Sequence, residues 1–435
     1  AGPMAHPIRP ESYIEINNFY TVTVYEKGAE IIRMQRELLG SDIYRKATDL
    51  YFDRYDGMAV TCDDFVQCMA DASGKDMNQF KRWYSQAGTP ELIVNSSYNE
   101  EKQTYTLEIS QHTPPTPGQK NKFPLHMPIK VGVINNNGDE ITEQTLELTE
   151  EKQSFTFENI PSKPVPSILR GFSAPVKLKT DICDEDLRFL MVHDNDGFNR
   201  WEAGQTYMMR ALQKLINDKS ASVDTNLIES YGILLDKSNE KEADKALLAR
   251  ALALPDIATI VQQQSLADPA LIHKAKNKII SAIKKSYKDK LIALHDANND
   301  EEFSNDFTAK SRRSLKNICL RILDDEHLAK TQYDSANNMT DRVAALSILS
   351  DASGQKCDNA FKDFYERFKN YPLVVDKWFS LQATGINDNT INIVNSLKTH
   401  KDFTYSNPNR VRSLYAAFAM NNPVVFHAEN GSGYK

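Results

Sequence analysis

The sequence predicts a multi-domain, mainly α-helical protein in which a small β-sandwich lies between two helical parts. Three observations predict this class. The chain has 435 residues, and at roughly 150 residues per domain this length suggests about three domains. The hydrophobic pattern changes twice, which gives the domains 1–88, 89–188 and 189–435. Apolar residues follow helical spacing in the first and third domains and alternate in the second.

Residues 1–88 are expected to be mainly helical. The segment EKGAEIIRMQRELLG (26–40) has apolar residues at helical spacing and ends on Gly40, a residue suited to a helix stop. A second helix follows and would end at Gly57. Thr61 and Asp64 have the spacing of a capping box and should open a third helix. Gly88 would close this segment.

Residues 89–188 are expected to form the sandwich. In TYTLEIS, the residues Tyr105, Leu107 and Ile109 alternate with polar ones, as in a half-buried strand. Asn137-Gly138 predicts a hairpin with a type I′ turn, since this turn needs positive φ angles. The segment PPTPGQKNKFPLHMP should be a long loop.

Residues 189–435 are expected to be helical throughout, with breaks at proline, glycine or asparagine. There is no tight internal repeat, but many helices joined by short turns are typical of stacked helix pairs. We therefore expect an irregular, solenoid-like α-helical superhelix that is truncated at its C-terminus. The amphipathic segments are 201–216, 242–252, 270–295, 313–323, 342–349, 357–368 and 374–381.

Composition excludes several classes of protein. The net charge of −7 and the modest number of glycines and prolines (17 and 18) disfavour disorder, fibrous folds and an electrostatic nucleic-acid binder. No stretch approaches the roughly 18 apolar residues of a membrane span. The five cysteines contain no CxxC pair, which favours a reducing compartment, and we expect a cytoplasmic protein.

The sequence contains no complete catalytic constellation. None of the nine histidines pairs with another at i, i+4 spacing, so HExxH is absent. The segment Asp194-Asn-Asp196-Gly resembles the start of a calcium loop but lacks the later acidic ligand, and we interpret it as a turn before a helix that begins near Asn199. We expect no metal site in this chain.

One short segment, NNFYTVTVYEKGA (17–29), contains a side chain that could take part in a reaction. Thr23 and Glu26 have capping-box spacing, which would start a helix at about Val24. Tyr25 would then lie in the first turn, near unpaired N–H groups and the positive end of the helix dipole. A phenol held there could donate a hydrogen bond to an oxyanion. On spacing alone, an ordinary aromatic residue at a helix start is the better explanation.

Eight segments of the chain change the interpretation of Tyr25. They are YEKGA, TCDDFVQCMADAS, RWYSQAGTP, GFSAPVKL, FNRWEAGQ, AKTQYDSANNMTDRVAALS, VVDKWFSLQAT and SNPNRVRSLYAAFAMNNPVVFHAENGSGY. Together they resemble the bacterial aminopeptidase N family of gluzincin zinc metallopeptidases, in the family's order and over nearly the whole chain. The resemblance implies that residues 1–88 are the end of a thermolysin-like catalytic domain. The sandwich and the helical superhelix would follow it.

The resemblance also implies site residues. Tyr25 matches the tyrosine that stabilises the oxyanion of the tetrahedral intermediate. Tyr20 matches an aromatic that lines the pocket for the first side chain of the substrate, against the alternative of a plain core tyrosine. Arg412 matches a basic residue that faces an internal cavity, against the alternative of a surface arginine in an ion pair.

The family's zinc motif HExxH and its amine-binding motif GxMEN are both absent. If the resemblance holds, the chain is a C-terminal fragment of a zinc aminopeptidase. It would act on peptide substrates only with the missing N-terminal and catalytic segments of the same protein, and alone it would bind no zinc and be inactive. The alternative is a stand-alone sandwich-plus-solenoid interaction module without catalysis. Helices of residues 1–88 with partly uncovered apolar faces would argue against that module.

Overall fold

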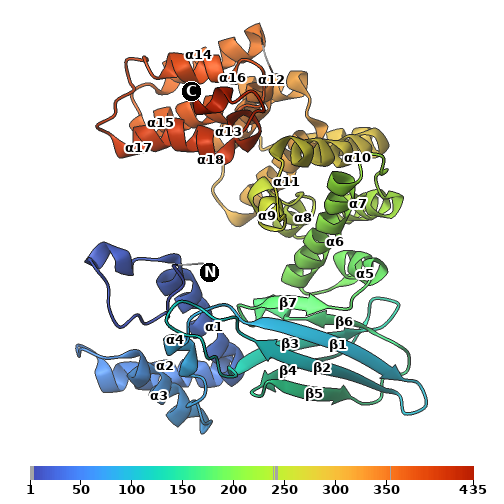
Figure 1. Ribbon diagram of the computed structural model, residues 1–435. Helices are drawn as coiled ribbons and strands as arrows, with labels where there is room; N and C mark the ends of the chain where they lie inside the picture. Colours follow the sequence, from blue (N-terminus) through green and yellow to red (C-terminus); the bar gives the residue numbers. More distant parts are fainter. Residues whose placement is uncertain (1–3, 239, 241–242, 353) are drawn as a thin grey trace. The chain divides into compact units, whose positions relative to one another are not determined.

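The computed structural model describes residues 4–238, 240, 243–352 and 354–435 (Figure 1). The chain divides into two compact units, residues 1–203 and 204–435. The predicted boundaries at 88 and 188 stay predictions. Position 188 lies inside helix α5 (Asp184–His193). No helix of the described residues has the length and apolar character needed to cross a membrane.

The first unit begins with helices whose ends follow the sequence pattern. Gly40 and Gly57 have φ angles of +78° and +72°, and both lie where a helix ends, as predicted. The backbone N–H of Asp64 donates to the Thr61 side chain, and the Asp64 carboxylate accepts from the Thr61 N–H, so the predicted capping box is confirmed. The helices are η1 (Ile16–Phe19), the π-helical turn η2 (Thr23–Lys27), α1 (Gly28–Leu39), α2 (Ser41–Tyr55), α3 (Cys62–Ser73) and α4 (Arg82–Ser85).

A β-sandwich follows, as predicted. One sheet has the strand order β5-β2-β1-β7 and the other the order β4-β3-β6. Within the first sheet β1 is antiparallel to β2 and parallel to β7. The strands are β1 (Glu91–Asn99), β2 (Thr104–His112), β3 (Met127–Ile134), β4 (Glu140–Leu148), β5 (Lys152–Phe157), β6 (Val165–Ile168) and β7 (Lys177–Thr180).

The hairpin between β3 and β4 is present, but its predicted type I′ turn is wrong. In the segment 135–139 only Gly138 has a positive φ angle, +92°, whereas type I′ needs positive φ at both central residues. The N–H of Gly138 donates to the Asn135 carbonyl at 3.0 Å. The Asn135 side chain also accepts from the N–H groups of Asn137 and Asp139. These side-chain bonds stabilise a longer loop that sequence spacing did not reveal.

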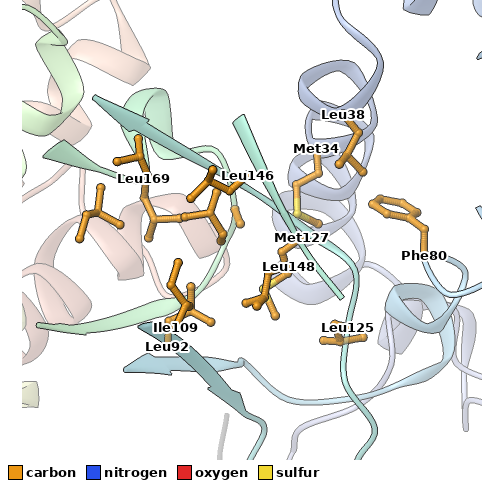
Figure 2. Close-up of a cluster of buried hydrophobic side chains, with 14 of the residues drawn as sticks. Met34, Leu38, Phe80, Leu92, Ile109, Leu125, Met127, Leu146, Leu148 and Leu169 are labelled. Carbon is orange, nitrogen blue, oxygen red and sulfur yellow. The ribbon is translucent and has the colours of Figure 1, made fainter. Parts of the chain in front are cut away.

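The helices of the first segment and the sandwich share one hydrophobic core. Figure 2 shows Met34 and Leu38 of α1 projecting toward Met127 of β3 and toward Phe80. Met34, Phe80 and Met127 are fully buried. The apolar face of α1 is therefore covered by the sandwich.

A buried ion network closes the other end of the sandwich. The Arg170 guanidinium contacts the Asp194 carboxylate at 3.0 Å and the Glu143 carboxylate at 3.0 Å, and it also pairs with Glu140. Asp194 is thus the acid of an ion pair in a turn, and the next helix, α6 (Gly197–Asn217), begins two residues before the predicted Asn199.

The second unit is helical, as predicted. All seven predicted segments overlap observed helices. Residue 242, where one of them was predicted to start, lies outside the described residues. Several helices, such as α7, α9, α12 and α16, were not predicted individually. The further helices are α7 (Thr225–Lys237), α8 (Lys245–Ala251), α9 (Ile257–Gln262), α10 (Pro269–Ala297), α11 (Phe307–Leu323), α12 (Glu326–Ser335), α13 (Met339–Asp351), α14 (Gln355–Phe368), α15 (Pro372–Thr384), α16 (Thr390–Leu397), α17 (Pro408–Val411), η4 (Arg412–Ala416), α18 (Ala417–Asn421), α19 (Pro423–Phe426) and η5 (Ser432–Tyr434).

Candidate functional site

Tyr25 lies in the middle of the π-helical turn η2, directly before α1. A π-helical turn has i→i+5 hydrogen bonds, is rare, and occurs mostly as a single turn joined to an α-helix, often at a functional site. Helix formers such as Glu26 and Lys27 follow the β-branched residues here, so the sequence indicates a helix start but does not specify its hydrogen-bond pattern. The π turn was therefore not predicted.

The start of this helix differs from the prediction. The backbone is helical from Val22 onward, and the cap is the hydroxyl of Thr21, which accepts the N–H of Val24 at 3.2 Å. Thr23 lies inside the π turn, so the predicted capping box of Thr23 and Glu26 is wrong. The Thr21 hydroxyl also contacts Nε2 of His6 at 3.0 Å, and spacing alone does not indicate this contact between residues 15 positions apart.

Tyr25 and Tyr20 lie next to each other on the surface. Their rings stack with centroids 6.0 Å apart and an interplanar angle of 29°. The side chains are 56% and 59% exposed, so neither is a core residue. The Tyr25 hydroxyl forms no hydrogen bond with the described part of the chain. The phenol is therefore free to donate to another group.

Lys27 anchors the last residue of the π turn. Its ammonium donates to the Gly88 carbonyl at 2.6 Å and lies 5.4 Å from the ring centre of Trp83. Burial, with a smaller contribution from Lys122, lowers the pKa of Lys27 to about 8. The contact joins residues 61 positions apart, so the sequence gave no signal for it. It fixes the turn that carries Tyr25 to the junction between the helices and the sandwich.

Gly88 is suited to this junction for two reasons. Its φ angle is +100°, a conformation that side chains rarely adopt. A Cβ atom here would also lie 3.1 Å from the Thr113 methyl and 3.2 Å from the Thr116 methyl. The carbonyl that accepts from Lys27 is thus presented by a backbone position that favours glycine.

Arg412 belongs to the second unit and begins another π-helical turn, η4. Its side chain is exposed and forms no ion pair with the described residues. By contrast, Arg410 is buried against Phe379 and pairs with Asp376 at 2.7 Å. Two of the three predicted site residues, Tyr25 and Arg412, therefore lie in π turns, and each belongs to a different unit.

The structure offers no zinc site within the part that it describes. No three His, Cys, Asp or Glu side chains lie close enough together there to hold a metal ion. A zinc ion next to Tyr25 would need ligands that these residues do not provide.

Comparison with protein families finds three matches in chain order. Residues 1–84 match the peptidase family M1 domain, and residues 88–181 match a domain of unknown function with an Ig-like fold (DUF3458). Residues 184–435 match a domain of unknown function with ARM repeats (DUF3458_C). The predicted class, a mainly helical protein with the end of a peptidase domain, a β-sandwich and a C-terminal α-helical superhelix, is confirmed.

Individual relatives match along the whole chain. Aminopeptidase N of Escherichia coli (strain K12) is 43% identical over 100% of this chain and 52% of that protein. Aminopeptidase N of Caulobacter vibrioides is 40% identical over 100% of this chain and 51% of that protein. The crystal structure of Legionella pneumophila aminopeptidase A in complex with aspartic acid has a TM-score of 0.87 at 30% identity, over 98% of this chain and 51% of that one. The chain thus spans about half the length of the curated relatives that it matches.

Proposed function

The chain belongs to the M1 peptidase family as a homologue of the C-terminal half of bacterial aminopeptidase N, and on this basis we propose that it supplies that half of a zinc aminopeptidase. Such an enzyme would remove N-terminal residues from peptides and serve peptide degradation. The observation that carries the proposal is a match that is continuous over every domain of the chain, which a short motif such as YEKG could not provide.

In the proposed enzyme, Tyr25 donates a hydrogen bond to the negative oxygen that develops on the scissile carbonyl. Three observations support this role: the exposure of the ring, a hydroxyl without a partner in the described chain, and the Lys27 contact that fixes the π turn. A donor held in place before the reaction stabilises the transition state without the cost of reorganisation. Zinc would be held by residues outside this sequence, since no three His, Cys, Asp or Glu side chains of the described residues lie close enough together to bind it.

Tyr20 and Arg412 receive secondary roles in this proposal. Tyr20 stacks on Tyr25, so a substrate whose carbonyl approaches the Tyr25 hydroxyl would bring its first side chain near the Tyr20 ring. Arg412 presents a charge that no described carboxylate neutralises, which suits contact with an acidic group of a peptide.

Exposed apolar residues near Tyr25 support the proposal against a stand-alone interaction module. They lie within residues 13–25, before and within the π turn. Six exposed large apolar side chains are many for a segment of 13 residues. These exposed side chains are Tyr13, Ile14, Ile16, Tyr20, Val22 and Tyr25. Exposed apolar side chains that gather in one segment are a candidate surface for contact with another protein part, and we assign that contact to the catalytic segments that this chain does not contain.

We also propose a cytoplasmic location. All five cysteines have free thiols, as is typical of proteins in reducing compartments.

A chimera tests the proposed function. The chain would replace the matching part of Escherichia coli aminopeptidase N, and zinc content and hydrolysis of aminoacyl-arylamides would be measured for the chimera and for the isolated chain. We expect one zinc and turnover in the chimera, and neither in the isolated chain. A folded, zinc-loaded chimera without turnover would contradict the proposal, as would turnover by the isolated chain. N-terminal sequencing of the natural product tests the module alternative, which a native chain starting at Ala1 would favour.

A further inference from the structure

A cavity of about 290 Å³ opens in the second unit between α14, α15, α16 and the segment after α16. All of its lining residues belong to that unit. The rings of Phe361, Tyr365 and Trp378 line it, and each of these residues is more than nine-tenths buried. Small-molecule sites typically measure roughly 300–1,000 Å³, so the cavity suits a ligand at the lower end, about the size of one amino acid.

The aromatic walls offer apolar surface to a ligand because their own polar atoms are already bonded. The indole N–H of Trp378 donates to the Phe361 carbonyl at 2.9 Å. The Tyr365 hydroxyl donates to the Asp402 carboxylate. An apolar or aromatic side chain could therefore pack against these rings without leaving a buried polar atom unpaired.

Two other lining residues keep hydrogen-bonding capacity. Nδ1 of His400 accepts the Asp402 N–H at 3.2 Å, so the neutral ring carries its proton on Nε2. Burial lowers the pKa of His400 and favours this neutral form. The amide nitrogen of Gln382 donates to the Trp378 carbonyl at 3.1 Å, which leaves its oxygen as an acceptor. The cavity thus contains a donor on His400 and an acceptor on Gln382 that no described residue uses.

The rim of the cavity carries one charge of each sign. Asp358 and Lys362 lie one turn apart on α14, both line the cavity, and both are exposed. Neither forms an ion pair with the described residues. A ligand with an ammonium and a carboxylate would find a complementary charge for each group.

We propose that this cavity binds a free amino acid with an aromatic or large apolar side chain. The side chain packs on the rings of Phe361, Tyr365 and Trp378. The ammonium pairs with Asp358, and the carboxylate pairs with Lys362. The His400 N–H donates a second hydrogen bond to the carboxylate. This inference does not depend on the proposed aminopeptidase activity, because it uses only residues of the second unit.

Equilibrium titration of the 435-residue chain with L-phenylalanine tests this site. Calorimetry and fluorescence under selective tryptophan excitation would report binding, since Trp378 lines the cavity. We expect a dissociation constant of the order of 1 mM, as is usual for so small a ligand. N-acetyl-phenylalanine amide, which lacks both charges, should bind about tenfold or more weakly, and the dipeptide Phe-Gly, whose carboxylate lies farther from its ammonium, should be weaker as well.

The variants Lys362→Met and Asp358→Asn change only exposed side chains, so both should fold. Each should weaken L-phenylalanine binding about tenfold, since a charge-assisted hydrogen bond is lost. Lys369→Met, an exposed lysine of the same segment that is absent from the lining, should leave the affinity unchanged. Equal affinity of the two rim variants and the parent chain would overturn the proposal, as would the absence of saturable binding. Equal affinity for the uncharged amide would also overturn it, and tighter binding of Phe-Gly would assign the cavity to peptide ends instead.

Discussion

Lys27 couples the protonation of one side chain to the geometry of the Tyr25 turn. The ammonium is held between a carbonyl and an indole ring, and burial lowers its pKa to about 8. In the unfolded chain the pKa of lysine is about 10.4. Between these two values the unfolded chain therefore binds more protons than the folded chain does at this site.

The free energy of unfolding should consequently rise with pH from about 8 to about 10.4 through Lys27. Chemical denaturation at a series of pH values, compared between the parent chain and Lys27→Met, measures this contribution. We expect the parent chain to gain about 1–3 kcal/mol more than Lys27→Met across this window. Lys46→Met, which removes an exposed lysine, should follow the parent curve. A parallel curve for Lys27→Met would show that the ammonium is not desolvated.

Tyr25 allows a more direct experiment in the chimera proposed above. Tyr25→Phe removes only the hydroxyl, and loss of one oxyanion donor typically lowers kcat by about 10²–10³. KM should change little, because the interaction forms mainly in the transition state. Tyr13→Phe, another exposed tyrosine of the same segment, is the matched control and should retain full activity. Near-parental kcat for Tyr25→Phe would refute its role while leaving the family assignment intact.

The site residues differ in how far the sequence could predict them. Tyr25 could be found because it belongs to a recognisable block of residues, and its role remains a prediction. Lys27 and Thr21 could not, because their partners, Gly88 and His6, are 61 and 15 positions away. Periodicity and capping motifs describe contacts within one or two turns and contain no information on such distant pairs.

At the scale of the elements, the packing of β6 and of the turn after it depends on one buried cation, the Arg170 guanidinium. Arg170 is 1% exposed and contacts Asp194, which is fully buried, as well as Glu143. A Cβ atom on Gly132 of β3 would overlap the guanidinium, so the strand is shaped to admit it. Burial raises the pKa of Asp194, while the guanidinium beside it acts in the opposite direction.

Arg170→Met should lower the free energy of unfolding by about 3–5 kcal/mol at pH 7, because it leaves a buried carboxylate without its partner. The pKa of Asp194 would rise further without the cation, so the loss should be smaller near pH 4 than at pH 7. Urea denaturation at both pH values measures the difference, and Arg45→Met, which breaks an exposed pair with Asp49, should cost less than about 1 kcal/mol. An equal loss at both pH values would exclude the carboxylate as the cause.

The helix and strand predictions were right where a single residue or a local motif determines the backbone conformation. Gly40, Gly57 and the Thr61–Asp64 box are such positions, and each ends or starts a helix as expected. The predictions failed at the Asn137-Gly138 turn, where the Asn135 side chain replaces turn hydrogen bonds. They also missed short helices such as α9, whose six residues (Ile257–Gln262) are too few to show a period.

At the scale of the molecule, the shared core of α1 and the sandwich decides which pieces can fold alone. Residues 1–203 keep that core complete, whereas residues 1–88 lose the strands that cover Met34. We expect residues 1–203 to unfold cooperatively when expressed alone and residues 1–88 to lack a cooperative transition. Circular dichroism during thermal unfolding measures both, and cooperative unfolding of residues 1–88 would show that the core is divided between two independent domains.

The π turn before α1 depends on the number of residues in this segment as well as on which residues they are. Such a turn accommodates one residue more than an α-helical turn, and each residue rotates the helix by about 100°. Deleting a single residue between Thr23 and Lys27 would let the segment close as a regular α-helix. The shorter turn would cover about the same rotation, so the segments on either side could keep their phase, but Tyr25 would lose the position that the extra residue gives it beside Tyr20. A one-residue deletion in this stretch should therefore disturb the placement of Tyr25 more than the fold of the segments on either side.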